Sequence, residues 1–353
     1  MNLKRNSART WIVSNPRILY RILRGFFRGL ILKKNTLRTL HILPTFSCQA
    51  TCQMCSVAKF KKGKENPLCL DEYESLAKQA AKMGAIAATF VGGEPLLVNN
   101  LDKIIGVFKS HHFYISIVTN GIALDRDIIK KLCSAGLNAI FFGLESLDEE
   151  INDTLRGYRG QCRKVLQNIE ICKEEGLLVG LCTVLFPEHE ERYIELAEFC
   201  QKKGLSMALP SLAGVGAAED TGAASQKEYE QILGLVKKYP LLSVDWDFSY
   251  FLKRRCPSGK EKIAITCYGD VLGCTLNHIS FGTIREESLN IIWKRAGHFS
   301  QFKKNSDRCL AAFDNVHIKS YLKPLIQVDE SPVHFQAHPN ITPESEPGLF
   351  SSK

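Results

Sequence analysis

The chain has 353 residues, of which 45% are hydrophobic and 24% charged, a balance typical of a soluble globular protein. This length accommodates one large domain and a smaller one. No run reaches the ~20 consecutive apolar residues of a membrane-spanning helix. The thirteen cysteines follow no recognisable signal peptide, which disfavours a secreted disulfide scaffold and predicts a cytoplasmic protein with reduced thiols.

The formal net charge of +9 arises in the N-terminal region. Residues 1–64 contain fourteen Lys and Arg residues and no Asp or Glu. Pro16 is placed to begin a helix within residues 1–37, and one face of this helix carries Arg17, Arg21, Arg24 and Arg28. The other face is apolar, with Leu19, Leu23, Phe26, Phe27 and Leu30.

A basic face opposite an apolar face is typical of a helix that lies on an anionic membrane. The pattern therefore predicts peripheral contact with the inner face of a membrane through residues 17–31. Three other interpretations stay open: the helix packs on the main domain with its arginines in water, contacts nucleic acid, or belongs to an organelle transit peptide. No nucleic-acid-binding motif accompanies it, so nucleic acid is not an expected partner.

From about residue 38, apolar strand-like runs alternate with amphipathic helical runs. The predicted strands are Thr39–Leu43, Ile86–Val91, Tyr114–Thr119, Ala139–Gly143, Leu178–Val184 and Leu205–Leu209. The predicted helices include Asp71–Met83, Asp125–Ala135, Gly160–Glu175 and Glu190–Lys203. This order predicts an α/β fold over residues 38–245, a partial (β/α)6 barrel of the TIM type with too few strands to close. In such barrels the chemistry lies at the C-terminal ends of the strands.

Three cysteines with the spacing Cys-x3-Cys-x2-Cys follow the first strand: Cys48, Cys52 and Cys55. Thiols this close in sequence cannot reach good disulfide geometry among themselves, but they can ligate three irons of one cubane cluster and leave the fourth iron open. The alternatives are a zinc site, which usually has two CxxC-like pairs, or buried structural cysteines. The spacing resembles the signature of the radical S-adenosylmethionine (SAM) superfamily.

In that family the open iron of the [4Fe-4S] cluster binds SAM, and an electron from a donor such as flavodoxin or ferredoxin cleaves it. The products are methionine and a 5′-deoxyadenosyl radical, which abstracts hydrogen from the substrate. By resemblance, the residues expected to contact SAM follow the second, third, fourth and sixth strands: Gly92, Gly93, Glu94, Pro95, Asn120, Glu145, Ser146, Arg156 and Ser211. Two alternatives stay open, since residues 92–95 also suit an ordinary turn and Glu145 and Ser146 also suit a helix cap.

A second cysteine group begins at Cys256 and Cys274, which flank a predicted hairpin, and ends at Cys309. This pattern resembles the SPASM/twitch extension of radical SAM enzymes and implies a small α+β domain over residues 246–322 with an auxiliary iron–sulfur cluster. A full SPASM domain has seven cysteines, so a truncated one is expected here, with Cys267, His317 or the substrate as fourth ligand. The alternative is a domain that has lost its metal. Residues 323–353 are rich in proline and are predicted to be extended or disordered.

The resemblance covers about residues 38–320 and implies an oxidoreductase-type radical SAM enzyme suited to an anaerobic cytoplasm. Its substrate stays open. The N-terminal helix favours a lipid or lipid-linked molecule at the membrane surface. The alternatives are a peptide maturase, for which the region before the first strand is too short to hold a winged-helix peptide-recognition domain, a small-molecule dehydrogenase, and a non-enzymatic electron carrier.

Overall fold

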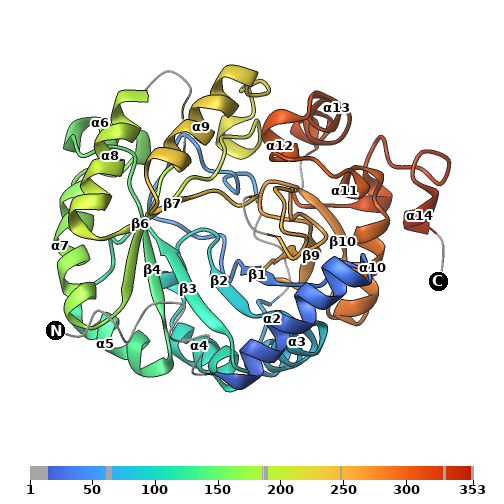
Figure 1. Cartoon of the computed structure of the whole chain (residues 1–353), viewed down its shortest axis with the longest axis horizontal. Helices are drawn as coiled ribbons and strands as arrows, with labels where there is room; N and C mark the ends of the chain where they lie inside the picture. The colour runs from blue at the N-terminus through green and yellow to red at the C-terminus, as the bar shows by residue number, and fades with distance from the viewer. Residues whose placement is uncertain are drawn as a thin grey trace.

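The computed structural model describes residues 15–60, 66–184, 186, 190–246, 249–328 and 331–350, so residues 1–14 of the predicted N-terminal segment lie outside it. Within the described residues, eleven strands form one continuous sheet in the order β11-β10-β9-β8-β1-β2-β3-β4-β5-β6-β7. Figure 1 shows the strands from β1 onward curving into a barrel wall with helices outside it.

The predicted partial barrel is confirmed by six parallel neighbours: β1 Thr39–Ile42, β2 Ala87–Phe90, β3 Tyr114–Thr119, β4 Ala139–Gly143, β5 Leu178–Cys182 and β6 Ser206–Ala208. A short seventh strand, β7 Leu242–Ser243, extends the wall beyond β6. At the other edge, β8 Lys262–Ile265 pairs in parallel with β1. The sheet therefore continues across the predicted domain limit at residue 245.

Helices cover the outside of the barrel: α3 Leu70–Met83, α4 Leu101–Ser110, α5 Arg126–Ala135, α6 Glu149–Arg156, α7 Gln161–Glu174, α8 Glu190–Lys203 and α9 Gln226–Lys238. Their limits follow local chemistry, since Asp125 and Asp148 cap the N-termini of α5 and α6 through their side chains. Residues alternate along each strand. Leu40 and Ile42 of β1 are buried against the helices, whereas Thr39 and His41 face the barrel interior.

The C-terminal region extends the same sheet. Strands β8 and β9 Asp270–Leu272 form the predicted hairpin, and β10 Ile279–Thr283 pairs with β9 in antiparallel fashion. The helices that follow are α10 Leu289–His298, α11 Ser300–Lys303, α12 Leu310–Phe313 and α13 Asn315–His317, with a π-helical turn η4 Ile318–Leu322.

The prediction of an extended or disordered tail is wrong for the described part of residues 323–353. This segment forms η5 Lys323–Gln327, β11 Val333–His334, η6 Phe335–Ala337 and α14 Pro347–Phe350. Strand β11 pairs in parallel with β10. The reason is the apolar residues between the prolines, since Val333, Phe335 and Leu349 are buried in the core.

The N-terminal helix α2 Pro16–Phe26 continues into the π-helical turn η1 Phe27–Ile31. Most of its basic face lies against the barrel. Arg21 donates to the carbonyl oxygens of Ala85, His111 and His112, and Arg24 donates to that of Lys82. These carbonyls belong to the C-terminal ends of α3 and α4, where the helix dipoles favour a cation. Arg17 contacts the His112 ring, and Arg28 donates to Thr36.

The apolar face of α2 and η1 consequently points to solvent. Leu23, Phe27 and Ile31 are 60%, 55% and 66% exposed. We call this row, together with Leu19, the apolar stripe. Leu19, Leu23 and Phe27 of the predicted apolar face are exposed, whereas Phe26 packs edge-on against Tyr250. Of the predicted basic face, Arg21 and Arg24 are bound by backbone carbonyls of the barrel, whereas Arg17 is exposed. No helix among the described residues is both long and apolar enough to cross a membrane.

Candidate functional site

The three N-terminal cysteines lie on the cysteine loop, residues 44–60, which leaves the C-terminal end of β1. The loop docks on the end of α6, where the amide of Gln53 donates to the carbonyl of Leu155 at 3.0 Å and the hydroxyl of Thr51 donates to that of Gly157. Gly157 takes a left-handed φ of +63°, and a Cβ there would collide with Thr51. The C-terminal end of α6 therefore fixes the position of the loop.

Gly92 and Gly93 allow the same loop to pass directly over the end of β2. A Cβ on Gly93 would lie 2.2 Å from the carbonyl oxygen of Ser47, and one on Gly92 would lie 2.7 Å from that of Thr45. Gly92 also has φ of +120°, which side chains rarely adopt. Gly92 and Gly93 thus allow two backbone segments of this chain to approach each other closely.

Glu94 is 1% exposed and joins the ends of two strands. Its carboxylate accepts hydrogen bonds from the Thr119 hydroxyl at 2.7 Å, the Asn120 amide at 2.8 Å and the Leu96 amide at 3.0 Å. Burial raises the pKa of Glu94, and these donors oppose the rise. Pro95 then begins the short helix η2 Pro95–Leu97. Glu94 and Asn120 are brought together as predicted from their positions at adjacent strand ends.

Two N–H donors point at the cysteine sulfurs. The side-chain amide of Asn120 lies 3.6 Å from Cys48 Sγ, and the guanidinium of Arg156 lies 3.8 Å from Cys52 Sγ. Burial raises the pKa of Cys48, and it raises that of Cys55 to about 11. Free thiols here stay protonated, whereas N–H donors and a bound metal both favour the thiolate.

Glu145 and Arg156 form a buried ion pair beside the cysteine loop. The second carboxylate oxygen of Glu145 accepts from the Val184 amide at 2.8 Å, and Arg156 also donates to the Cys182 carbonyl. Gly143 makes room for the pair, since a Cβ there would lie 2.3 Å from the guanidinium. Burial raises the pKa of Glu145, and Arg156 opposes the rise. Arg156 Nε is buried and has no hydrogen-bond partner among the described residues, so one donor is left over.

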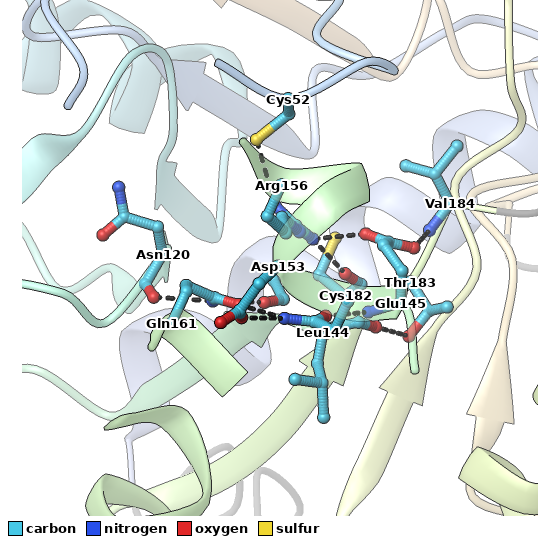
Figure 2. Close-up of polar contacts among 12 residues, drawn as sticks. Cys52, Asn120, Leu144, Glu145, Asp153, Arg156, Gln161, Cys182, Thr183 and Val184 are labelled. Atoms are coloured by element: carbon cyan, nitrogen blue, oxygen red, sulfur yellow. Dashed lines mark hydrogen bonds and ion pairs between the residues drawn. The ribbon is translucent and has the colours of Figure 1, made fainter. Parts of the chain in front are cut away.

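A network of buried amides supports this pair from below, as Figure 2 shows. Asn152 accepts from the Glu145 amide at 2.9 Å and donates to Gln161 at 2.6 Å. Gln161 in turn donates to the carbonyls of Asn120 and Gly143, each at 2.8 Å. Asn152 and Gln161 are fully buried, and no sequence motif indicated their role. Their effect is to hold the ends of β3 and β4 against α6 and α7.

The two serines among the predicted SAM contacts have different surroundings. Ser146 Oγ accepts from the Asp148 amide at 3.1 Å and closes a local turn, whereas the N-cap of α6 is Asp148, so the helix-capping alternative does not hold for Ser146. Ser211 is 6% exposed, and its hydroxyl is without a partner among the described residues. Because buried hydroxyl groups almost always have a hydrogen-bond partner, Ser211 is a better candidate for a ligand contact than Ser146, whose hydroxyl is already bonded within a turn.

The three cysteines of the second group, Cys256, Cys274 and Cys309, line one cavity. Burial raises the pKa of Cys309 well above its ordinary value, and the adjacent thiols Cys256 and Cys274 raise it further. Of the two predicted protein candidates for a fourth ligand, Cys267 lies at the other end of β8, where its carbonyl accepts from Leu68. His317 contacts Asn277, and its ring lies against Phe299 and Tyr321.

Comparisons with known proteins now identify the family. Residues 42–200 match the model of the radical SAM superfamily, and residues 256–312 match SPASM, an iron–sulfur cluster-binding domain. Together the two matches cover more than half of the chain.

The chain belongs to the radical SAM superfamily.

Two relatives of this radical SAM protein are PqqA peptide cyclases. That of Xanthomonas euvesicatoria pv. vesicatoria (strain 85-10) is 26% identical over 279 residues, which are 73% of this chain and 74% of the relative. That of Granulibacter bethesdensis (strain ATCC BAA-1260 / CGDNIH1) is 26% identical over 277 residues, with the same shares covered.

Solved structures share its fold. Streptococcus suis SuiB bound to the precursor peptide SuiA superposes with a TM-score of 0.61 at 17% identity, over 78% of this chain and 68% of SuiB. Native anSMEcpe with bound AdoMet superposes with a TM-score of 0.55 at 16% identity, over 72% of this chain and 80% of that chain.

A radical SAM enzyme with a SPASM domain uses a [4Fe-4S] cluster, SAM and auxiliary iron–sulfur chemistry, and the donor chemistry here fits it. Both groups offer soft thiol ligands, and N–H donors lie at two of the sulfurs. Among the described residues, no three His, Cys, Asp or Glu side chains lie close enough together to hold one metal ion. A zinc ion would need sulfurs within about 4 Å of one another, given its short Zn–S bonds, whereas a multi-iron cluster spreads them further.

The interior of the radical SAM barrel holds a cavity of about 370 Å³. Met54 and Ser56 of the cysteine loop line it, and so do all three cysteines of the second group. Ser211 and Cys182 lie on its wall. The cavity therefore reaches from Met54 and Ser56 of the cysteine loop to the second cysteine group.

Sequence reasoning missed the polar residues inside this cavity. His41, Thr89 and Ser116 lie on β1, β2 and β3, and Asp245 and Lys262 form an ion pair at 2.6 Å. A signal existed for the first three, because a polar residue at an inward position of an otherwise apolar parallel strand is unusual. We call these five residues the polar floor.

Proposed function

We propose that this radical SAM enzyme modifies a peptide and that a side chain of the peptide enters the barrel cavity. The observation that carries the proposal is the cavity of about 370 Å³ that lies between the cysteine loop and the second cysteine group. Relatives named PqqA peptide cyclase and the fold shared with SuiB, which was solved with its precursor peptide, support a peptide. These comparisons favour the peptide alternative over the lipid or lipid-linked substrate that the N-terminal helix suggested.

The cofactors are assigned to the residues that the sequence motifs predicted. Cys48, Cys52 and Cys55 would hold the [4Fe-4S] cluster, and Cys256, Cys274 and Cys309 an auxiliary cluster. SAM would lie at the strand ends, against Gly92, Gly93, Glu94, Pro95, Asn120, Glu145, Ser146, Arg156 and Ser211. When bound, cluster and SAM supply the 5′-deoxyadenosyl radical that abstracts hydrogen from the substrate. The electron is expected from a flavodoxin or ferredoxin.

The chain's own residues contribute position and charge. Glu94 joins the end of β2 to that of β3 through hydrogen bonds. The cysteine loop, which passes over β2, therefore keeps a fixed position relative to the Asn120 side chain. Arg156 neutralises Glu145 and donates toward Cys52, while its Nε keeps a spare donor for an anionic group such as a carboxylate. The apolar cavity wall excludes water from the reacting atoms.

The test uses the anaerobically reconstituted enzyme with the short peptides encoded beside its gene. We expect one of them to become lighter by a pair of hydrogen atoms, with 5′-deoxyadenosine formed in step, and mass spectrometry measures both. The Cys48→Ala/Cys52→Ala/Cys55→Ala variant is the control and forms neither. Turnover of SAM without a peptide product would point to a small-molecule dehydrogenase, and an intact cluster that never cleaves SAM would point to an electron carrier.

We also propose that the apolar stripe attaches the enzyme to an anionic membrane surface. The stripe is exposed, and Arg17, Lys33 and Lys34 are exposed at its two ends. Tyr250 packs against Gly25 and Gly29 of the helix, and Leu252, which follows it, is 69% exposed next to the exposed Lys253. Apolar side chains bordered by cations complement anionic lipid in both hydrophobicity and charge.

Replacing Leu23 and Phe27 with glutamate is expected to weaken binding to vesicles of phosphatidylglycerol and phosphatidylcholine about a hundredfold, because two apolar contacts are lost. Vesicle co-sedimentation measures the effect. The control is Leu241→Glu/Val316→Glu, two exposed apolar residues outside the stripe. Unchanged binding in the stripe variant would contradict the proposal, as would a self-association, detected by ultracentrifugation, that only the stripe variant loses.

A further inference from the structure

The polar floor begins as a row across three neighbouring strands. His41 of β1 is in register with Thr89 of β2, and Thr89 with Ser116 of β3. The Thr89 and Ser116 hydroxyls lie 2.9 Å apart and satisfy each other. Burial, reinforced by the charge of Lys262, lowers the pKa of His41 to about 3, so its ring is neutral. The row therefore offers hydrogen bonds without a net charge.

Asp245 and Lys262 complete the floor from the two edges of the barrel. Asp245 follows β7, Lys262 begins β8, and their ion pair at 2.6 Å spans the gap between these edges. Burial alone would raise the pKa of Asp245, but the ion pair with Lys262 outweighs it and lowers the pKa to about 2. The Lys262 side chain is only 5% exposed, whereas that of Asp245 is 57% exposed and borders the cavity. One carboxylate oxygen thus remains able to accept from a ligand.

Several buried polar atoms on the cavity wall are without a partner among the described residues. They are His41 Nδ1, Ser211 Oγ, Trp246 Nε1 and Ser258 Oγ. Buried polar groups in folded proteins almost always have a hydrogen-bond partner. The indole of Trp246 can only donate, so its partner must be an acceptor. The cavity wall can therefore form hydrogen bonds with a polar group of a ligand that both donates and accepts them.

The upper wall is apolar, with Val91, Val118, Phe141, Val184, Leu209 and Leu276. A ligand that matches both regions has an apolar body and a polar tip. Because Asp245 and Lys262 already cancel each other, a charged tip would leave one charge uncompensated in the interior. A neutral tip carries no such cost.

We infer that the cavity selects a substrate side chain with an apolar body and a neutral hydroxyl tip, of which a phenol is the simplest, with Asp245 as the specificity-determining acceptor. The hydroxyl would donate to Asp245 and accept from a wall donor such as Trp246 Nε1. The volume of about 370 Å³ accommodates a single aromatic side chain. This inference rests on the proposed function only in taking the ligand to be part of a peptide.

The test compares two single-residue probes that differ only in the hydroxyl group, N-acetyl-L-tyrosinamide and N-acetyl-L-phenylalaninamide. Isothermal titration of the reconstituted holoenzyme with SAM is expected to show about tenfold tighter binding of the tyrosine probe, the typical effect of a hydrogen bond to a charged acceptor. In Asp245→Leu/Lys262→Met the ratio is expected to fall below about twofold. Removing both charges together leaves no buried charge without a partner.

Asp127→Asn, an exposed acid on α5, is the matched control and should keep the wild-type ratio. Should the double variant be unstable, the isosteric Asp245→Asn variant is expected to lower the ratio severalfold, since an amide oxygen accepts more weakly than a carboxylate. Equal binding of both probes to the wild type, or a tyrosine preference that survives in these variants, would overturn the inference. If the probes behave as expected while no peptide is modified, the inference stands and the peptide proposal fails.

Discussion

Replacing Cys48, Cys52 and Cys55 together with alanine is expected to abolish the cleavage of SAM and to remove about four iron atoms per chain, the content of one cubane cluster. The physical reason is that the cysteine loop supplies the thiols, while the groups that contact the sulfurs of Cys48 and Cys52, from Asn120 and Arg156, are N–H donors and not metal ligands. Iron and sulfide analysis with EPR on anaerobically reconstituted protein measures the loss, and the yield of 5′-deoxyadenosine measures the activity.

The iron that remains in this variant reports on the second cysteine group. About four irons should remain, because Cys256, Cys274 and Cys309 are unchanged. The matched variant with alanine at these three positions should lose that iron and keep the EPR signal of the SAM-binding cluster. Iron near zero in the first variant would contradict the auxiliary site, and redox-neutral radical chemistry would then become the better hypothesis.

Arg156→Met is expected to lower the free energy of unfolding by about 3–5 kcal/mol, because it leaves the buried Glu145 carboxylate without its counter-charge. Chemical denaturation followed by circular dichroism measures the effect. The double variant Glu145→Gln/Arg156→Met should recover most of the loss, since no buried charge then remains. A single variant as stable as the wild type would show that the pair does not hold the end of β4 to α6.

The Arg156→Met variant should also have a distinct pH dependence. Burial raises the pKa of Glu145 and Arg156 opposes the rise, so removing the guanidinium raises that pKa further. A carboxyl with a raised pKa in the folded state binds more protons there than in the unfolded state, so stability falls as pH increases between the two pKa values. The deficit of the variant relative to the wild type should therefore be smaller at acidic pH than at neutral pH. A deficit that grows on acidification would contradict this.

The barrel strands could be predicted because their signal is local. An apolar run bounded by turn residues can be recognised from neighbouring residues alone, without knowledge of the sheet. The observed limits of β3 and β4 are accordingly the predicted ones. The cysteine loop could also be placed, since it follows β1 in a fold whose chemistry lies at the strand ends. The resemblance to a known family then gave the cofactors, which no spacing alone could supply.

The orientation of α2 could not be predicted from its own residues. Helical periodicity determines which side chains share a face, but the face that packs depends on the carbonyls that Arg21 and Arg24 reach, 58 to 91 residues away in sequence. The polar floor could not be predicted for the same reason. Asp245 and Lys262 meet only when the sheet curls and brings the residues next to β7 and β8 together. Long-range pairing of this kind has no local pattern.

The hydrogen-bonded pairing of β8 with β1 has a consequence for how such a protein can diverge. Thr39 is in register with Lys262, and Ile42 with Ile265. The SPASM segment therefore contains a strand, β8, that is hydrogen-bonded directly to β1, the strand that leads into the cysteine loop. A graft of this segment onto another barrel would succeed only if it kept that register, since a slip of one residue turns Lys262 away from the interior. Insertions and deletions are therefore best tolerated in the loops. The distance in space between the two cysteine groups is set by the pairing of β1 with β8 and should change little between related proteins.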